Sequence, residues 1–236
     1  VICADLQNRD GAELLAEGVL GSLSAPFSIQ NREFFVTASI GMAFYPDDGE
    51  ESQSLLKNAD LALYQAKDAG RAGYKFFTSK MDQAANKRLT MESYLRHAIE
   101  RDELYVRYQP IVHLDTGDMV GVEALLRWHN PKLGEVYPDQ FIPLAEETGL
   151  IHEMGEWVFR QACKDAIVWQ HKRPLRLAIN ISPRQFSSPA RFVETVLDTL
   201  EETGMPPSLL ELEITEGALL IDLPEVTRLL EEFESL

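Results

Sequence analysis

Two predicted strands in the second half of the chain each have one wholly aliphatic face and one face with polar residues. Side chains alternate between the two faces of a strand, so residues 175–182 place leucine and isoleucine on one side and Asn180 on the other. Residues 210–216 likewise place Glu211 and Glu213 opposite a row of leucine and isoleucine. This division predicts a sheet whose aliphatic face packs on helices and whose polar groups gather on the opposite face.

A third predicted strand, residues 119–128, carries an acid and a base on the same face. The side chains of Glu123, Leu125 and Arg127 point the same way if the strand is regular. In an extended strand Glu123 and Arg127 lie about 13 Å apart. Glu123 is therefore the third polar group that this sheet could place beside Asn180 and Glu213.

Strand and helix patterns alternate throughout this half of the chain. Such alternation argues for parallel βα units, and hence for a barrel or a doubly wound sheet. The predicted strands are residues 104–114, 119–128, 175–181 and 210–215, and the predicted helices are residues 138–147, 151–170, 189–203 and 223–235.

In a βα barrel the three polar side chains would converge. Aliphatic faces pack on the surrounding helices, and the opposite faces point inward, toward the mouth at the carboxyl ends of the strands. Oxygen ligands suit Mg²⁺ or Mn²⁺, which bind phosphate and activate water. On spacing alone the alternatives stay open: a solvated or ion-paired Glu123 or Glu213, a turn-capping Asn180, and an Arg127 that pairs with a nearby acid.

The first hundred residues have a different order of elements. Apolar residues at helical spacing end before Gly70, a residue suited to the left-handed conformation after a helix. The polar helix that comes last is the best linker candidate. The predicted elements are a helix over 11–24, a hairpin around 30–32 whose second strand runs from 34 to 45, a helix over 52–69, a strand over 71–77 and a helix over 79–99.

Composition narrows the class of ligand. The chain has a formal net charge of -16 and 45% hydrophobic residues, which indicates a folded protein that repels nucleic-acid polymers. A small anion bound to a metal or an arginine stays compatible with this charge. With two cysteines, no apolar segment long enough to span a membrane and no secretion signal, the sequence predicts a cytoplasmic location.

The polar strands lie within a series of motifs that resembles a known family. In order, the motifs are Tyr-Gln-Pro-Ile at 108–111, Glu-Ala-Leu-Leu-Arg-Trp at 123–128, the block 141–151, Asn-Ile-Ser at 180–182 with Gln-Phe at 185–186, and Glu-Leu-Glu-Ile-Thr-Glu at 211–216. This order resembles bacterial EAL-domain cyclic-di-GMP phosphodiesterases. The resemblance implies a TIM-type (β/α)₈ barrel that hydrolyses one phosphodiester bond of cyclic-di-GMP to give the linear dinucleotide.

The resemblance also implies roles for individual residues. Glu123, Asn180 and Glu213 are implied to hold the catalytic Mg²⁺ or Mn²⁺, and Glu216 to brace a loop at the metal site. Gly217 departs from the family pattern, which usually has serine there.

The remaining implied contacts are with the dinucleotide. The resemblance assigns them to Gln109, Leu125 and Arg127. It also implies a homodimer formed through the EAL domain.

Residues 59–71 are similar to the late helix block of GGDEF diguanylate cyclases, and residues 36–41 to the strand before it. In that family the positions of Lys67 and Arg71 contact nucleotide phosphates, which implies a contact with GTP here. The alternative is structural, with Lys67 on a solvated helix face and Arg71 in the turn that caps the helix.

These resemblances predict three parts of the chain: the C-terminal part of a GGDEF domain over 1–78 (α+β), a linker helix over 79–100, and the N-terminal half of an EAL barrel over 101–236 (α/β). The signature loop of the cyclase is expected before Val1, and the paired-aspartate strand of the barrel after Leu236. We therefore expect no cyclase activity from this chain and four of eight barrel strands.

Three hypotheses follow for function. The parent protein is a phosphodiesterase, or its EAL domain is an inactive receptor that binds cyclic-di-GMP, or the chain is a partial product without activity of its own. The presence of Glu123, Asn180 and Glu213 favours the phosphodiesterase for the parent.

Overall fold

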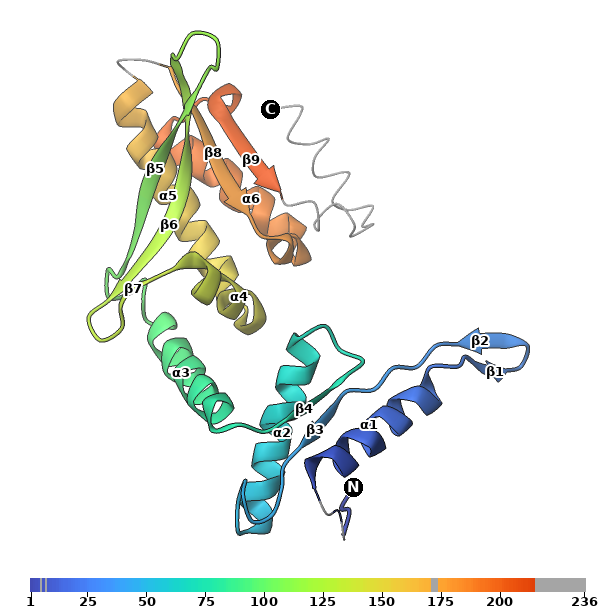
Figure 1. The fold of residues 1–236 in the computed structure, drawn as a ribbon. Coiled ribbons are helices and arrows are strands. Elements are labelled where there is room, and N and C mark those ends of the chain that lie inside the picture. The colour runs from blue at the N-terminus through green and yellow to red at the C-terminus, as the bar shows by residue number, and fades with distance from the viewer. Residues whose placement is uncertain (5, 7, 171–173, 215–236) are drawn as a thin grey trace. The chain divides into compact units, whose positions relative to one another are not determined.

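The structure is a computed structural model, and it describes residues 1–4, 6, 8–170 and 174–214. The chain divides between Thr90 and Met91 into two compact units. Figure 1 shows the elements of both units. The helix predicted over 223–235 lies outside the described residues.

The first unit contains two small pairs of strands. Strands β1 and β2 are antiparallel, and β3 and β4 are parallel. The elements are α1 (Arg9–Leu23), β1 (Phe27–Ile29), β2 (Arg32–Phe34), β3 (Ile40–Met42), α2 (Ser52–Asp68), β4 (Tyr74–Phe76) and the start of α3 (Ser79–Leu95).

The prediction of one strand from 34 to 45 is wrong. β2 ends at Phe34, where its pairing with β1 ends, and β3 spans only the three residues that pair with β4. A strand persists only where a partner accepts its backbone hydrogen bonds. Between β2 and β3, Phe35 and Val36 are exposed, so β propensity alone did not extend the strand.

Helix α2 ends as the position of Gly70 predicts. Gly70 has a φ of +110°, and the Arg71 N–H donates to the Ala66 carbonyl at 3.2 Å. The Gly70 N–H also donates to the Lys67 carbonyl, at 3.4 Å, which completes the Schellman pattern. Arg71 itself has a φ of +61°, so its backbone is held in a conformation that is uncommon for a residue with a Cβ.

Strand β3 lies very close to α2. A Cβ on Gly41 would come within 2.1 Å of both the Ala59 carbonyl oxygen and the Leu63 nitrogen. Only glycine therefore lets β3 approach the helix backbone this closely.

The second unit contains the alternating elements that the sequence predicts. Helix α3 ends at Leu95 and not near Ile99, and hydrogen-bonded turns follow it. The other elements are β5 (Leu104–Val112), β6 (Met119–Asn130), β7 (Gly134–Val136), α4 (Pro138–Thr148), α5 (Ile151–Gln170), β8 (Arg176–Ile181), the 3₁₀ helix η1 (Pro183–Ser187), α6 (Pro189–Thr203), the 3₁₀ helix η2 (Pro207–Leu209) and β9 (Leu210–Ile214).

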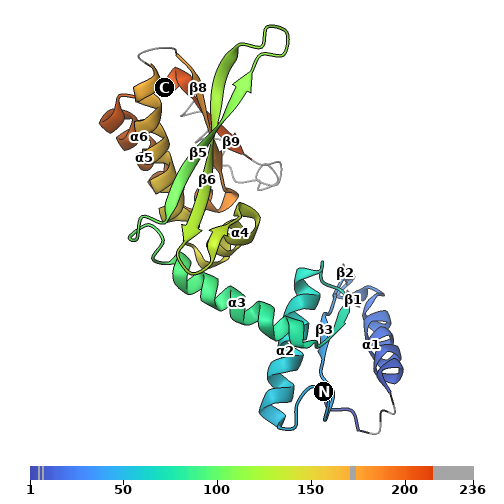
Figure 2. The same ribbon diagram turned by 60° about the vertical axis from the view of Figure 1, so that its left-hand side comes forward.

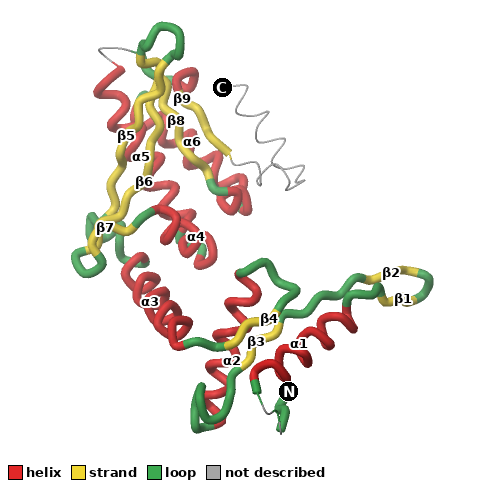
Figure 3. Tube along the Cα trace, viewed as in Figure 1, coloured by secondary structure: helices red, strands yellow, loops and turns green. Residues whose placement is uncertain are grey.

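The sheet of this unit has the order β5-β6-β8-β9, with β7 paired to β6 (Figure 3). Strands β6, β8 and β9 are parallel, as the alternation predicts, but β5 is antiparallel to β6. The reason is the short connection over 113–118, since a parallel pair needs a crossover of about a dozen residues or more. The described sheet is open, as expected for part of a barrel.

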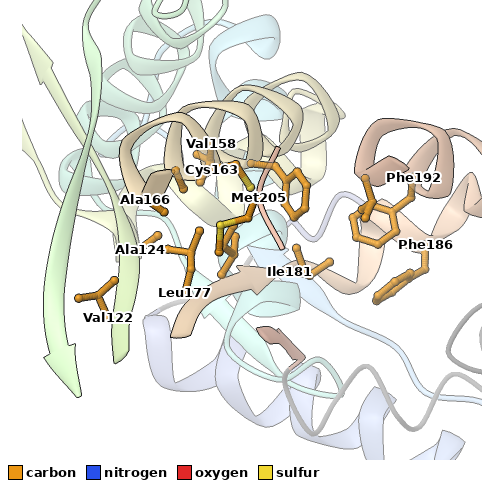
Figure 4. Close-up of a cluster of buried hydrophobic side chains, with 14 residues drawn as sticks. Val122, Ala124, Val158, Cys163, Ala166, Leu177, Ile181, Phe186, Phe192 and Met205 are labelled. Carbon is orange, nitrogen blue, oxygen red and sulfur yellow. The ribbon is translucent and has the colours of Figure 1, made fainter. Parts of the chain in front are cut away.

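Helices α5 and α6 cover one face of this sheet, as Figures 1 and 2 both show. Leu177, Ile179 and Ile181 of β8 are buried in the cluster that includes Val158 and Cys163 of α5 (Figure 4). The aliphatic face predicted for residues 175–182 is therefore the face that packs on helices.

A second core cluster joins the end of α3 to α4 and β6. Trp128 and Phe141 are fully buried and meet edge to face at 5.7 Å, with Leu95 in the same cluster. This cluster fixes the end of β6 that follows Arg127.

Candidate functional site

The three polar residues singled out in the sequence lie on three neighbouring strands. Glu123 of β6 pairs in register with Ala178 of β8, and Asn180 of β8 pairs with Glu213 of β9. The Asn180 side-chain Nδ2 donates a hydrogen bond to Glu123 Oε1 at 2.7 Å. The sheet therefore brings a carboxylate, an amide and a second carboxylate together.

These side chains point away from the helices. Val122 and Ala124, the residues on either side of Glu123, are buried in the helix-covered core. Ile179 and Ile181 of β8 are buried there too. Because successive side chains alternate, the polar groups occupy the opposite face, which is the interior face in a barrel.

Burial and like charge raise the pKa of Glu213. Partial removal from water is the larger cause, and repulsion from Glu123 and then Glu211 adds to it. Arg176 lies 3.4 Å from Glu211 and offsets part of that negative charge. A cation bound here would relieve the repulsion between Glu213 and the neighbouring acids.

The predicted dinucleotide contacts lie on the same face. Antiparallel pairing sets Gln109 of β5 opposite Glu123, and Tyr105 opposite Arg127. Gln109 is exposed, and Leu125 is partly buried between Glu123 and Arg127 in the strand. Their roles in binding the dinucleotide stay predictions.

Arg127 is held in place by its own backbone. Its Nη1 donates to the Leu126 carbonyl at 2.8 Å. Arg127 is partly buried, and its remaining N–H groups can donate to an anion on the face that carries Glu123.

The donor set fits a hard divalent cation. Two carboxylates and one amide offer oxygen atoms, and the hydrogen bond from Nδ2 to Glu123 leaves Oδ1 as the oxygen donor of Asn180. Within the described ranges no three residues among His, Cys, Asp and Glu gather into a metal cluster. A site built from Glu123, Asn180 and Glu213 would take one of its ligands from an amide and would leave coordination positions for water or phosphate.

The sequence predicts three further site residues, Glu216, Lys67 and Arg71. Glu216 is outside the described residues. Lys67 and Arg71 are exposed at the C-terminal end of α2, in the first unit. Their positions allow either the predicted phosphate contact or the structural alternative.

Sequence reasoning missed a hydrogen-bonded group beside Asn180. The Ser182 hydroxyl donates to Glu146 Oε1 of α4 at 2.7 Å. Ser182 also forms a capping box with Gln185 at the start of η1. The Ser-x-x-Gln spacing is a capping-box signature that could have revealed the second contact, but no sequence signal points to Glu146.

Glu103 is a second residue that the sequence did not single out. It is 7% exposed, and its Oε2 accepts hydrogen bonds from Trp128 Nε1 at 3.0 Å and Asn130 Nδ2 at 2.9 Å. The carboxylate thus ties the start of β5 to the end of β6. This role is structural, because both partners are buried in the interior.

A small cavity lies away from these polar groups. It has a volume of about 20 Å³ and lies between α5, η1 and α6, where His152, Thr195 and Phe159 contribute to its lining. It belongs to the helix-covered side of the sheet. The chemistry of the carboxylate face, and not this cavity, therefore locates the candidate site.

The chain matches two protein families. Residues 92–236 match the EAL domain, and residues 1–73 match the GGDEF domain of diguanylate cyclases. Within the described residues, no helix combines the length and apolarity needed to cross a bilayer.

Two curated relatives illustrate the similarity. MucR of Pseudomonas aeruginosa, a bifunctional diguanylate cyclase/cyclic di-GMP phosphodiesterase, is 40% identical over 100% of this chain and 35% of its own length. An uncharacterized signaling protein of Caulobacter vibrioides is 45% identical over 88% of this chain and 25% of its own length. The chain therefore spans about a quarter to a third of the length of these relatives.

Solved structures show the same fold. The PaMucR phosphodiesterase in its c-di-GMP complex superposes with a TM-score of 0.59 at 40% identity, over 62% of this chain and 60% of that one. The EAL enzyme Bd1971 with cAMP and cyclic-di-GMP bound superposes with a TM-score of 0.61 at 28% identity, over 79% of this chain and 49% of that one. The polar sheet face and these matches agree: the chain belongs to the EAL domain family through residues 92–236, and its residues 1–73 are a segment of a GGDEF domain.

Proposed function

We propose that the protein containing this chain hydrolyses cyclic-di-GMP to the linear dinucleotide with the help of divalent metal ions. The observation that carries the proposal is the convergence of Glu123, Asn180 and Glu213 on one face of the sheet. MucR, NbdA and the Escherichia coli protein PdeR, all at least 34% identical to this chain, bear names that include cyclic di-GMP phosphodiesterase.

In this proposal Glu123, Asn180 and Glu213 hold Mg²⁺ or Mn²⁺. The bound cation would supply a polarised phosphate and an activated water for in-line attack. The protein supplies the fixed geometry: Asn180 turns its amide nitrogen toward Glu123, so its oxygen is the atom presented to a metal. Glu216 is proposed to brace the loop beside this site.

Gln109, Leu125 and Arg127 are the proposed contacts to the dinucleotide. Arg127 offers a planar set of donors that suits a phosphate, on the face that carries the carboxylates. The local cation and the metal together would overcome the overall charge of -16, which repels an anionic ligand at long range.

For the first unit we propose a contact with a nucleotide. In this proposal the exposed side chains of Lys67 and Arg71, at the end of α2, bind the phosphates of GTP. The division into residues 1–78, 79–100 and 101–236, a homodimer formed through the EAL domain and a cytoplasmic location also stay proposals.

The test is a hydrolysis assay on the full-length gene product. Linear dinucleotide is quantified by chromatography with Mg²⁺, with Mn²⁺ and with a chelator. Glu123→Gln is compared with Glu202→Gln, a matched control that removes the same charge from an exposed ion pair with Arg160, between α5 and α6.

Metal-dependent turnover that is lost in Glu123→Gln and kept in Glu202→Gln supports the proposal. Tight binding of cyclic-di-GMP with no turnover in the wild type would instead make the domain a receptor. Equal turnover in wild type and Glu123→Gln would remove the assignment of the metal site.

A further inference from the structure

The chain segment that follows Asn180 is held by side-chain contacts on two sides. Ser182 donates from its hydroxyl to Glu146 Oε1 at 2.7 Å, and the same hydroxyl accepts from the Arg184 N–H at 3.2 Å. The Ser182 N–H donates to Gln185 Oε1 at 3.0 Å. Each polar group of Ser182 is thus engaged, since its carbonyl accepts from the Gln185 N–H at 2.9 Å.

Gln185 is itself fixed against α5. Its side chain is 6% exposed, and a Cβ on Gly155 would lie 2.2 Å from its Nε2. The absence of a side chain at Gly155 therefore provides the space for this amide. The capping box of η1 is held to α5 at this point.

The contact with Glu146 is not needed to cap η1. The hydrogen bonds with Arg184 and Gln185 already complete the capping box. The bond from Ser182 to Glu146 adds a link between the end of β8 and α4. A link of this kind, next to a proposed metal ligand, resembles the outer contacts that orient ligands in metal sites.

Geometry connects this link to Asn180. Ser182 lies two residues beyond Asn180 and, by the period of a strand, on the same side of the chain, about 7 Å further along. The backbone between the two residues runs through Ile181, which is 4% exposed in the core. Because Ile181 is buried and Ser182 is bonded to α4, the backbone at the end of β8 is held in place. This restricts the positions that the Asn180 amide can take.

We propose that Glu146 is a positioning residue that acts through the Ser182 hydroxyl to orient the Asn180 amide for metal binding. The proposal rests on the metal site of the proposed function. Glu146 acts on the site without being a ligand: its Oε1 accepts a hydrogen bond from the Ser182 hydroxyl, and the Asn180 amide nitrogen stays directed toward Glu123.

The test measures Mn²⁺ affinity from the electron paramagnetic resonance signal of free Mn²⁺, with the full-length gene product and without substrate. Ser182→Ala removes the hydroxyl, Ser182→Thr keeps it, and Glu146→Gln weakens the acceptor. Glu202→Gln is the control for loss of one acidic charge in an interhelical contact. Loss of an outer contact to a metal ligand weakens affinity by about 10-fold to 100-fold, so Ser182→Ala and Glu146→Gln are expected to lose about tenfold.

The variants separate this proposal from a structural effect. Ser182→Thr is expected to bind Mn²⁺ within about threefold of wild type, because its hydroxyl can still donate to Glu146. Glu202→Gln is expected to bind like wild type. If Ser182→Ala fails to fold, Glu146→Gln and Ser182→Thr carry the same comparison.

Each remaining result has a definite meaning. Wild-type affinity in both Ser182→Ala and Glu146→Gln, with affinity lost in Glu123→Gln, overturns the positioning role and leaves the metal site standing. Wild-type affinity in Glu123→Gln overturns the proposed function and the positioning role together.

Discussion

The amide of Asn180 and the carboxylate of Glu123 are joined by a 2.7 Å hydrogen bond across two parallel strands. The bond orients both side chains at once, because Asn180 has one donor group and Glu123 can only accept when ionised. An uncharged residue thereby lies beside one carboxylate and pairs in register with another, Glu213.

The first prediction concerns this uncharged residue. Asn180→Asp replaces a donor with a third acid beside Glu123, and like charges on neighbouring strands cost up to about 1 kcal/mol per pair. In the presence of a chelator at neutral pH, we expect the Tm to fall by about 2–4 °C for each kcal/mol lost. Differential scanning calorimetry checks this result.

Addition of Mg²⁺ should restore more of the Tm in Asn180→Asp than in wild type, because the variant has more repulsion to relieve. An unchanged Tm of Asn180→Asp in chelator would contradict electrostatic repulsion between residue 180 and Glu123.

The second prediction concerns pH. The pKa of Glu213 is raised in the folded state by burial, Glu123 and Glu211. A carboxyl with a raised pKa contributes stability below its unfolded pKa and loses that contribution as pH rises through the folded pKa. Without metal, ionised Glu213 therefore destabilises the fold at neutral pH.

Glu213→Gln is accordingly expected to raise the free energy of unfolding of the metal-free protein at pH 7, by up to about 1 kcal/mol. At about pH 3, below the ordinary range of glutamate pKa values, the advantage should vanish because the carboxyl is protonated in both the folded and the unfolded state. Urea unfolding at the two pH values, with chelator present, measures the difference. A variant that is less stable than wild type at pH 7 would contradict the repulsion between these acids.

The third prediction separates two adjacent residues. Tyr108 points to the helices, where its hydroxyl donates to Asp165 at 2.7 Å and its ring meets Trp169 edge to face. Gln109 faces the opposite way, with Glu123. Burial and the bond to Asp165 raise the pKa of Tyr108 well above its usual value.

Tyr108→Phe should therefore lower the free energy of unfolding by about 1–2 kcal/mol and leave binding of cyclic-di-GMP unchanged. Gln109→Ala should do the reverse, with weaker binding and little change in stability. Urea unfolding and calorimetric titration of the same two variants give both readouts. The reverse pattern would place the ligand on the helix side.

The fourth prediction concerns Gly41 in the first unit. Gly41→Ala would press a methyl group against the backbone of α2, at 2.1 Å from Ala59 and Leu63. Because backbone cannot move aside as a side chain can, we expect the free energy of unfolding to fall by more than about 2 kcal/mol. We also expect faster proteolysis of residues 1–90. Gly18→Ala, at an α1 position where a Cβ meets nothing within 4 Å, is the matched control. Equal protease resistance of the two variants would contradict the packing described for β3.

Much of the fold could be predicted because its signals are local. The alternating faces of residues 175–182 and 210–216 identified the helix-covered side, and Leu177 and Leu212 pack there. Gly70 marked the end of α2 through its positive φ. These features depend on period and on single-residue conformation, which a sequence displays directly.

The rest depends on pairing and on distant contacts. Of the strand predicted over 34–45, only the last residue of β2 and the three residues of β3 are in strands, because only these residues pair with another strand. Strands β5 and β6 are antiparallel because the connection over 113–118 is short. The prediction from alternating strands and helices did not take the length of this connection into account. The link from Ser182 to Glu146 spans 36 residues, and no local pattern encodes such a contact.

For the candidate site, the sequence placed Glu123, Asn180 and Glu213 on a common face, and the register of β6, β8 and β9 has that arrangement. Their roles as metal ligands stay predictions.

The most direct measurement is the Mn²⁺ affinity of wild type, Glu123→Gln, Asn180→Ala and the double variant. The account predicts a loss of at least about tenfold in each single variant and a double variant that loses less than the sum of the two free-energy changes, because the residues act as one unit. Wild-type affinity in all three variants would contradict a metal site at these strands.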